Sequence, residues 1–140
     1  MQAGTGATNV IPGELQIECN FRFSTESTPE NLRQRFEDIL AHHKLSYSLD
    51  WTLYGSPFLT DTGGLLPATL DAIKAICGYS ATPLTNGGTS DGRFIAPTGA
   101  EVVELGPCNA TIHKVDERVR CSEIETLSAI YQKLLENLIA

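Results

Sequence analysis

The sequence predicts an α/β protein in two pieces, the first of them an α+β unit of strand, helix and strand. Apolar and polar residues alternate over residues 14–23, which is the period of a half-buried strand. A helical pattern follows, and a second alternating stretch occupies residues 47–53. The pattern changes character after a glycine-rich connector at 55–64. We therefore expect one piece at 1–56 and another at 57–140.

The first piece combines two amphipathic strands with one helix. The polar face of the strand at 14–23 includes Arg22. Thr28 can cap the helix that follows, Pro29 suits its first position, and Glu30 complements the positive end of its dipole. The apolar residues that we expect to pack together are Leu15, Ile17, Cys19, Phe21, Phe23, Leu32, Phe36, Ile39, Leu40, Leu49 and Trp51.

The second piece has two helical patterns and a short apolar run. A helical stripe over 66–77 should end at Gly78. Residues 102–105 are apolar without clean alternation, which is typical of a strand buried on both faces. Ser122 and Glu125 form a capping box for the last helix. The apolar stripe of that helix is Ile124, Leu127, Tyr131, Leu134, Leu135 and Leu138. Neither piece contains a complete core by itself.

Composition and charge exclude several classes of protein. The balance of 41% hydrophobic and 19% charged residues is typical of a soluble globular protein. A net charge of −7 without any stretch rich in lysine or arginine argues against nucleic acid and anionic membranes as partners. The four cysteines form no C-x-x-C pair, which argues against a zinc finger. We expect Cys19 and Cys77 to be buried free thiols in a reducing cytoplasm.

Three loops contain unusual combinations of glycine and polar residues, at 4–12, 85–94 and 106–117. In the second loop, paired glycines allow the backbone to approach a ligand closely. If a short helix begins near Ser90 or Asp91, a carboxylate could bind at the loop residues Gly88, Thr89 and Ser90. The alternative is a tight turn capped by Ser90 or Asp91. The motif alone does not decide between them.

His113 lies in the third loop, after a short apolar run and a Gly-Pro turn. A lone histidine in such a loop is either a surface residue or a metal ligand. The residues around it leave both interpretations open.

The order of four segments resembles the C-terminal part of bacterial succinyl-diaminopimelate desuccinylases. The segments are N-V-I-P-G-E-L, F-R-F-S, G-G-T-S-D-G-R-F and E-L-G-P-C-N-A-T-I-H-K-V-D-E. The resemblance covers the chain from about Ala3 to the last helix. It implies that residues 1–56 are the C-terminal half of a lid and dimerisation domain. Residues 57–140 would then be the C-terminal part of a zinc-peptidase-like α/β catalytic domain.

The same resemblance implies the roles of individual residues. His113 matches a ligand of one of two zinc ions, and Asn9 and Arg22 match lid residues that contact the carboxylate-bearing end of the substrate. Gly88, Thr89 and Ser90 match a loop that binds substrate near the metals. Asp91 and Arg93 are expected to brace that loop. The remaining zinc ligands and the catalytic base lie upstream in these enzymes, so we expect no catalytic residue here and an inactive isolated chain.

The resemblance implies hydrolysis of N-succinyl-LL-2,6-diaminopimelate to succinate and LL-2,6-diaminopimelate in a cytoplasmic homodimer or higher homo-oligomer. The cofactor would be two zinc ions per active site, replaceable by cobalt. Acetylornithine deacetylase and dipeptidases, which are neighbouring amidohydrolases, remain alternatives. A third hypothesis is a non-catalytic dimerisation module.

Overall fold

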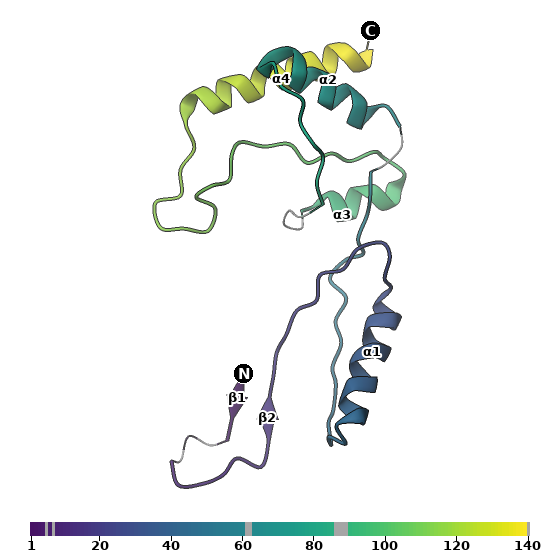
Figure 1. Ribbon diagram of the computed structural model, residues 1–140, viewed down its shortest axis with the longest axis vertical. Helices are drawn as coiled ribbons and strands as arrows, with labels where there is room; N and C mark the ends of the chain where they lie inside the picture. The colour runs from purple at the N-terminus through teal and green to yellow at the C-terminus, as the bar shows by residue number, and fades with distance from the viewer. Residues whose placement is uncertain (5, 7, 61–62, 86–89, 140) are drawn as a thin grey trace. The chain divides into compact units, whose positions relative to one another are not determined.

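The computed structural model describes residues 1–140 except 5, 7, 61–62, 86–89 and 140 (Figure 1). The chain divides into two compact units, residues 1–48 and 49–140. The assignment of 1–56 and 57–140 to two domains stays a prediction.

The first unit consists of a short hairpin and one helix. Strands β1 (Gln2–Ala3) and β2 (Leu15–Gln16) pair antiparallel, with Ala3 opposite Leu15. Helix α1 spans Pro29–His42 and begins as predicted. The Thr28 hydroxyl accepts a hydrogen bond from the Asn31 amide at 3.1 Å, and Pro29 occupies the first turn.

The long strand predicted at 14–23 is wrong over most of its length. Only β2 is paired, and residues 17–24 continue toward α1 as an extended trace without regular secondary structure (Figure 1). Residues 47–53 contain no strand either. Alternation of apolar and polar residues indicates which side chains favour burial, but a strand also requires a hydrogen-bonded neighbouring strand. Beyond β1 and β2, the described residues pair no strands.

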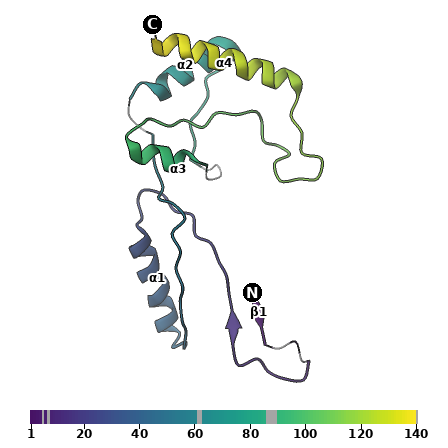
Figure 2. The same ribbon diagram turned by 180° about the vertical axis from the view of Figure 1, so that it is seen from behind.

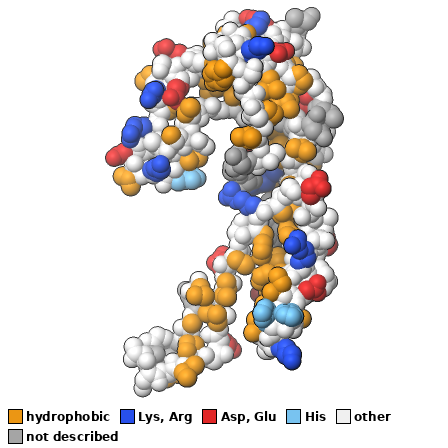
Figure 3. Space-filling view, viewed as in Figure 1, with side chains coloured by type: hydrophobic (Ala, Val, Ile, Leu, Met, Phe, Trp, Pro, Cys, Tyr) orange, Lys and Arg blue, Asp and Glu red, His pale blue; other side chains and the backbone are white. Residues whose placement is uncertain are grey.

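The apolar face predicted for the first unit is only partly covered. The Phe21 and Phe36 rings meet edge to face at 5.6 Å, and Phe23 and Leu32 are half-buried. In contrast, Leu15 and Ile17 remain more than half exposed. Cys19 is also exposed, so its predicted burial is wrong, whereas Cys77 is half-buried. Exposed hydrophobic side chains are visible in the space-filling view (Figure 3).

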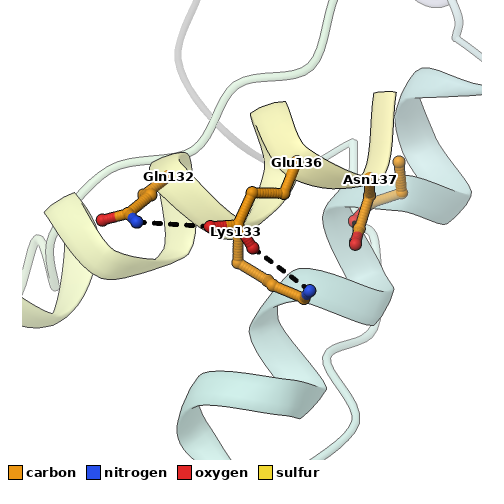
Figure 4. Close-up of polar contacts among 5 residues, drawn as sticks. Gln132, Lys133, Glu136 and Asn137 are labelled. Carbon is orange, nitrogen blue, oxygen red and sulfur yellow. Dashed lines mark hydrogen bonds and ion pairs between the residues drawn. The ribbon is translucent and has the colours of Figure 1, made fainter. Parts of the chain in front are cut away.

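The core of the second unit lies between two helices. Helices α2 (Leu65–Cys77) and α4 (Cys121–Ile139) lie side by side in both views (Figure 2). Their shared apolar cluster is Ala72, Ile73, Ile130 and Leu134. Outside this cluster, Asn137 lies beside α2 (Figure 4). Its side-chain amide donates to the Ala68 carbonyl at 3.3 Å. The contact is narrow, because Leu135 and Leu138 of the predicted stripe are about half exposed.

The predicted ends of the helices are partly correct. α2 ends at Gly78, whose left-handed φ of 77° suits glycine, as predicted. The capping box predicted at Ser122 is wrong, because α4 begins at Cys121 and Ser122 is already helical. The Ser122 carbonyl instead accepts from the Thr126 hydroxyl at 2.9 Å. None of the described helices is long and apolar enough to cross a membrane.

A distant glutamate caps the start of α2. Gly64, at the N-cap position, has no side chain to offer, and Glu101 supplies the carboxylate instead. Its two oxygens accept from the Gly64 amide at 3.2 Å and from the Leu65 amide at 2.6 Å. Any Cβ at Gly63, whose φ is 100°, would collide with this carboxylate. The arrangement satisfies two orphan donors and places negative charge at the positive end of the helix.

We predict that Glu101→Gln lowers the free energy of unfolding by about 1 kcal/mol, because an amide NH2 then faces a backbone donor. The measurement is chemical denaturation of both proteins. Asp71→Asn is the matched control, because it removes an exposed carboxylate from α2 away from the cap. Equal stability of the Glu101 variant and the unchanged protein would contradict the capping role.

Candidate functional site

The loop between β1 and β2 presents Asn9. Pairing of the two strands holds both ends of this loop together, and Asn9 lies exposed in a turn within it. Gly4, with a φ of 65°, packs closely against Pro12, so the loop also closes on itself near its base. Asn9 is thus exposed to solvent on a loop whose two ends are held together by the β1–β2 pairing.

Arg22 is exposed, next to the Phe21 ring that packs against α1. The alternation predicted for this stretch therefore holds locally, with an aromatic ring toward the helix and the guanidinium toward solvent. No hydrogen bond links Arg22 to Asn9 among the described residues.

The side chain of Ser90 is already engaged. Its hydroxyl donates to the Glu104 carboxylate and accepts from the Gly92 amide at 3.0 Å. The predicted short helix is present as α3 (Gly92–Ile95), followed by the 3-10 helix η1 (Ala96–Thr98). The Ser90 hydroxyl therefore bonds to the first residue of α3, whose N-cap position is Asp91. The other two predicted binding residues, Gly88 and Thr89, lie outside the described residues.

The start of α3 is closely packed against the rest of the unit. A Cβ at Gly92 would lie 2.8 Å from the Phe58 ring and 2.9 Å from a Val102 methyl, so only glycine fits. The Arg93 guanidinium lies over the Phe94 ring, 4.6 Å from its centroid. The Arg93 chain also packs against Gly55, where a Cβ would come within 2.6 Å. These contacts are to Gly55 and Phe94, and the bracing role expected of Asp91 and Arg93 stays a prediction.

His113 lies exposed in a loop that is hydrogen-bonded to itself. Its backbone has a φ of 60°, and its amide donates to the Glu117 carboxylate at 3.4 Å. The ends of the loop meet where the Thr111 hydroxyl bonds to both backbone groups of Arg118, at 2.9 and 3.0 Å. The imidazole makes no hydrogen bond within the described part of the chain, so its nitrogens remain available.

The described residues bring no three histidine, cysteine, aspartate or glutamate side chains together in a metal-binding cluster. His113 therefore offers one donor without companions from this part of the chain. Asn9 and Arg22 belong to the first unit, and Ser90 and His113 to the second. No hydrogen bond joins Ser90 to His113 in the described ranges.

All four cysteines are described, and all are free thiols. The pKa of Tyr79 is raised above its ordinary value, chiefly because negative charge on Cys77 repels the phenolate. A hydrogen bond between the two side chains adds to this effect, and charge on Cys108 contributes less.

Sequence reasoning missed Glu104 and Thr111. The sequence pattern does not indicate the hydrogen-bond partner of either residue. Glu104 bonds to Ser90, fourteen residues away, and Thr111 bonds to Arg118, seven residues away. The one sign that Glu104 has a structural role was its charge within the otherwise apolar run at 102–105. Thr111 carried no signal.

The chain belongs to the peptidase family M20/M25/M40, whose family model matches residues 2–137. Enzymes of this family generally depend on two metal ions.

The chain is 60% identical over 139 residues to the succinyl-diaminopimelate desuccinylase of Hahella chejuensis. It is 58% identical over 139 residues to the succinyl-diaminopimelate desuccinylases of Alkalilimnicola ehrlichii and of Nitrosococcus oceani. In each case the match covers 99% of this chain. The chain spans only 36 to 37% of the length of these curated relatives.

Proposed function

We propose that this chain is the C-terminal part of an enzyme that hydrolyses the amide of N-succinyl-LL-2,6-diaminopimelate to succinate and LL-2,6-diaminopimelate. The observation that carries the proposal is 60% identity over 139 residues to a succinyl-diaminopimelate desuccinylase. Membership of the M20/M25/M40 family supports a metal-dependent hydrolase.

We assign His113 as a ligand of one of two zinc ions, for which cobalt can substitute. An exposed imidazole on a loop held by its own hydrogen bonds is suited to serve as one metal ligand. The described residues form no cluster that would supply the other ligands. Bound metal of this kind activates water and polarises a carbonyl. The other ligands and the catalytic base are assigned to other parts of the longer enzyme, and no catalytic residue to this chain.

Arg22 and Asn9 are assigned to the carboxylate-bearing end of the substrate. An exposed guanidinium binds a carboxylate through two parallel hydrogen bonds, and Arg22 is exposed beside a packed aromatic ring. Gly88, Thr89 and Ser90 are assigned to the substrate near the metals. Because the Ser90 hydroxyl donates its hydrogen bond to Glu104, we assign the substrate contact of Ser90 to its backbone.

Residues 1–56 are proposed to belong to a lid that forms a homodimer or higher homo-oligomer in the cytoplasm. The half-exposed Leu15 and Ile17 support a covering partner for this segment. A monomer in light scattering at micromolar concentration would contradict it.

The alternatives within the superfamily, such as acetylornithine deacetylase or a dipeptidase, differ from the proposed enzyme in the substrate that they hydrolyse. The full-length enzyme should hydrolyse the succinylated diaminopimelate in preference to acetylornithine and dipeptides. A non-catalytic dimerisation module would hydrolyse none of these.

We predict that His113→Ala in the full-length enzyme lowers turnover by about a hundredfold or more and reduces bound metal from about two ions to about one per site. Metal analysis and steady-state kinetics measure the two effects. His42→Ala is the control, since His42 is an exposed histidine at the end of α1. Unchanged metal content and turnover would make His113 a surface residue.

We predict that Arg22→Ala weakens substrate binding by roughly ten- to a hundredfold, the loss of about 1.5–3 kcal/mol expected for a charge-assisted pair. Arg22→Lys should lose less, because it keeps the charge but not the planar fork. Steady-state kinetics on the succinylated substrate gives the values. Arg35→Ala, another exposed arginine of the same unit, should have little effect. If kcat/KM stays unchanged in both Arg22 variants, Arg22 does not contact the substrate.

A further inference from the structure

One hydroxyl group closes the loop that carries His113. The Thr111 hydroxyl donates to the Arg118 carbonyl at 2.9 Å and accepts from the Arg118 amide at 3.0 Å. A threonine side chain thereby replaces the backbone partner that Arg118 would have in a strand pair. Thr111 is half-buried, although the residues around it are exposed.

The backbone inside this loop is held in an unfavourable conformation. His113 and Asp116 both have a φ of 60°, in the left-handed region that non-glycine residues rarely occupy. Such residues persist where their surroundings determine the backbone strongly. Here the surroundings include turn hydrogen bonds from the Ile112 amide to Asn109 at 3.0 Å and from the Lys114 amide to Thr111 at 3.1 Å. The Lys114 ammonium also donates to the Ala110 carbonyl at 2.9 Å.

These bonds lie on the N-terminal side of the loop, whereas the bonds of Thr111 to Arg118 join its two ends. Without the hydroxyl, the C-terminal end keeps weaker contacts among the described residues. These are the 3.4 Å bonds from the His113 amide to Glu117 and from the Arg118 guanidinium to the Asp116 carbonyl. The left-handed conformation of His113 would then be free to relax.

We propose that Thr111 is the positioning residue for His113, and that its hydroxyl fixes the direction in which the imidazole meets the metal. This rests on the proposed function, which makes His113 a metal ligand. Thr111 does not contact metal or substrate. It acts by restricting the loop, so its loss reduces metal affinity through the larger number of conformations open to His113.

Hydrogen exchange tests loop closure independently of the enzyme activity. In the full-length enzyme, Thr111→Val keeps the side-chain shape but removes the hydroxyl. The Arg118 amide should then exchange about five- to tenfold faster, the loss of one hydrogen bond. Thr111→Ser should restore slow exchange. Unchanged exchange in the valine variant would overturn the proposal.

Zinc affinity of the full-length enzyme, measured by competition with a chelator, tests the positioning role. Thr111→Val should weaken the affinity of one site by about 10- to 100-fold, and Thr111→Ser should recover it. Thr126→Val is the matched control, because it removes a threonine hydroxyl bonded to backbone in α4 and should leave zinc affinity unchanged.

The outcomes separate the two claims. If His113→Ala does not alter zinc affinity, the proposed metal role of His113 fails, and the positioning role fails with it. If His113→Ala weakens zinc but Thr111→Val does not, only the positioning role is overturned. A loss in Thr111→Val that serine does not rescue also contradicts it, because the hydroxyl is then not the cause.

Discussion

The second unit depends on one extended segment, residues 101–105, to which four other parts of the chain are hydrogen-bonded. Glu101 caps α2, and the Val102 carbonyl accepts from the Thr60 hydroxyl. Glu104 accepts from Ser90 at the start of α3, and the Leu105 carbonyl accepts from the Tyr131 hydroxyl of α4 at 2.6 Å. Because the apolar contact between α2 and α4 is narrow, these side-chain bonds fix the loops that the helices alone would leave free.

The position of this segment also explains how the candidate residues are held. His113 lies in the loop that follows this segment along the chain, and Ser90 is bonded to the segment. A change at 101–105 therefore affects the capping of α2 and the loop residue Ser90 at the same time. Carboxylates in this segment serve the structure, so their presence near the candidate residues does not by itself indicate catalysis.

The sequence predicted several parts of the fold whose causes are local, although the equally local capping box at Ser122 was wrong. The Thr28 cap, the Gly78 end of α2 and the short helix after Ser90 depend on residues within one or two turns, and they are present. The strands at 14–23 and 47–53 depend on pairing with another segment, which alternation cannot specify. The strand predicted at 102–105, buried on both faces, is wrong: these residues form no strand, Glu104 is exposed, and the other three are only half-buried. They bond to other segments through side chains and carbonyls without a strand ladder. The candidate residues were inferred from the family resemblance. The Ser90–Glu104 and Thr111–Arg118 bonds could be seen only in the structure.

We propose that this chain supplies substrate contacts and one metal ligand to a site completed by other residues. The most direct measurement is zinc-dependent release of succinate from N-succinyl-LL-2,6-diaminopimelate by the purified 140-residue chain, beside the full-length enzyme under identical conditions. We expect turnover by the full-length enzyme and none above background by the chain, because one imidazole cannot hold a catalytic zinc that uses three protein ligands. Zinc-dependent turnover by the chain alone, abolished by a chelator, would contradict it.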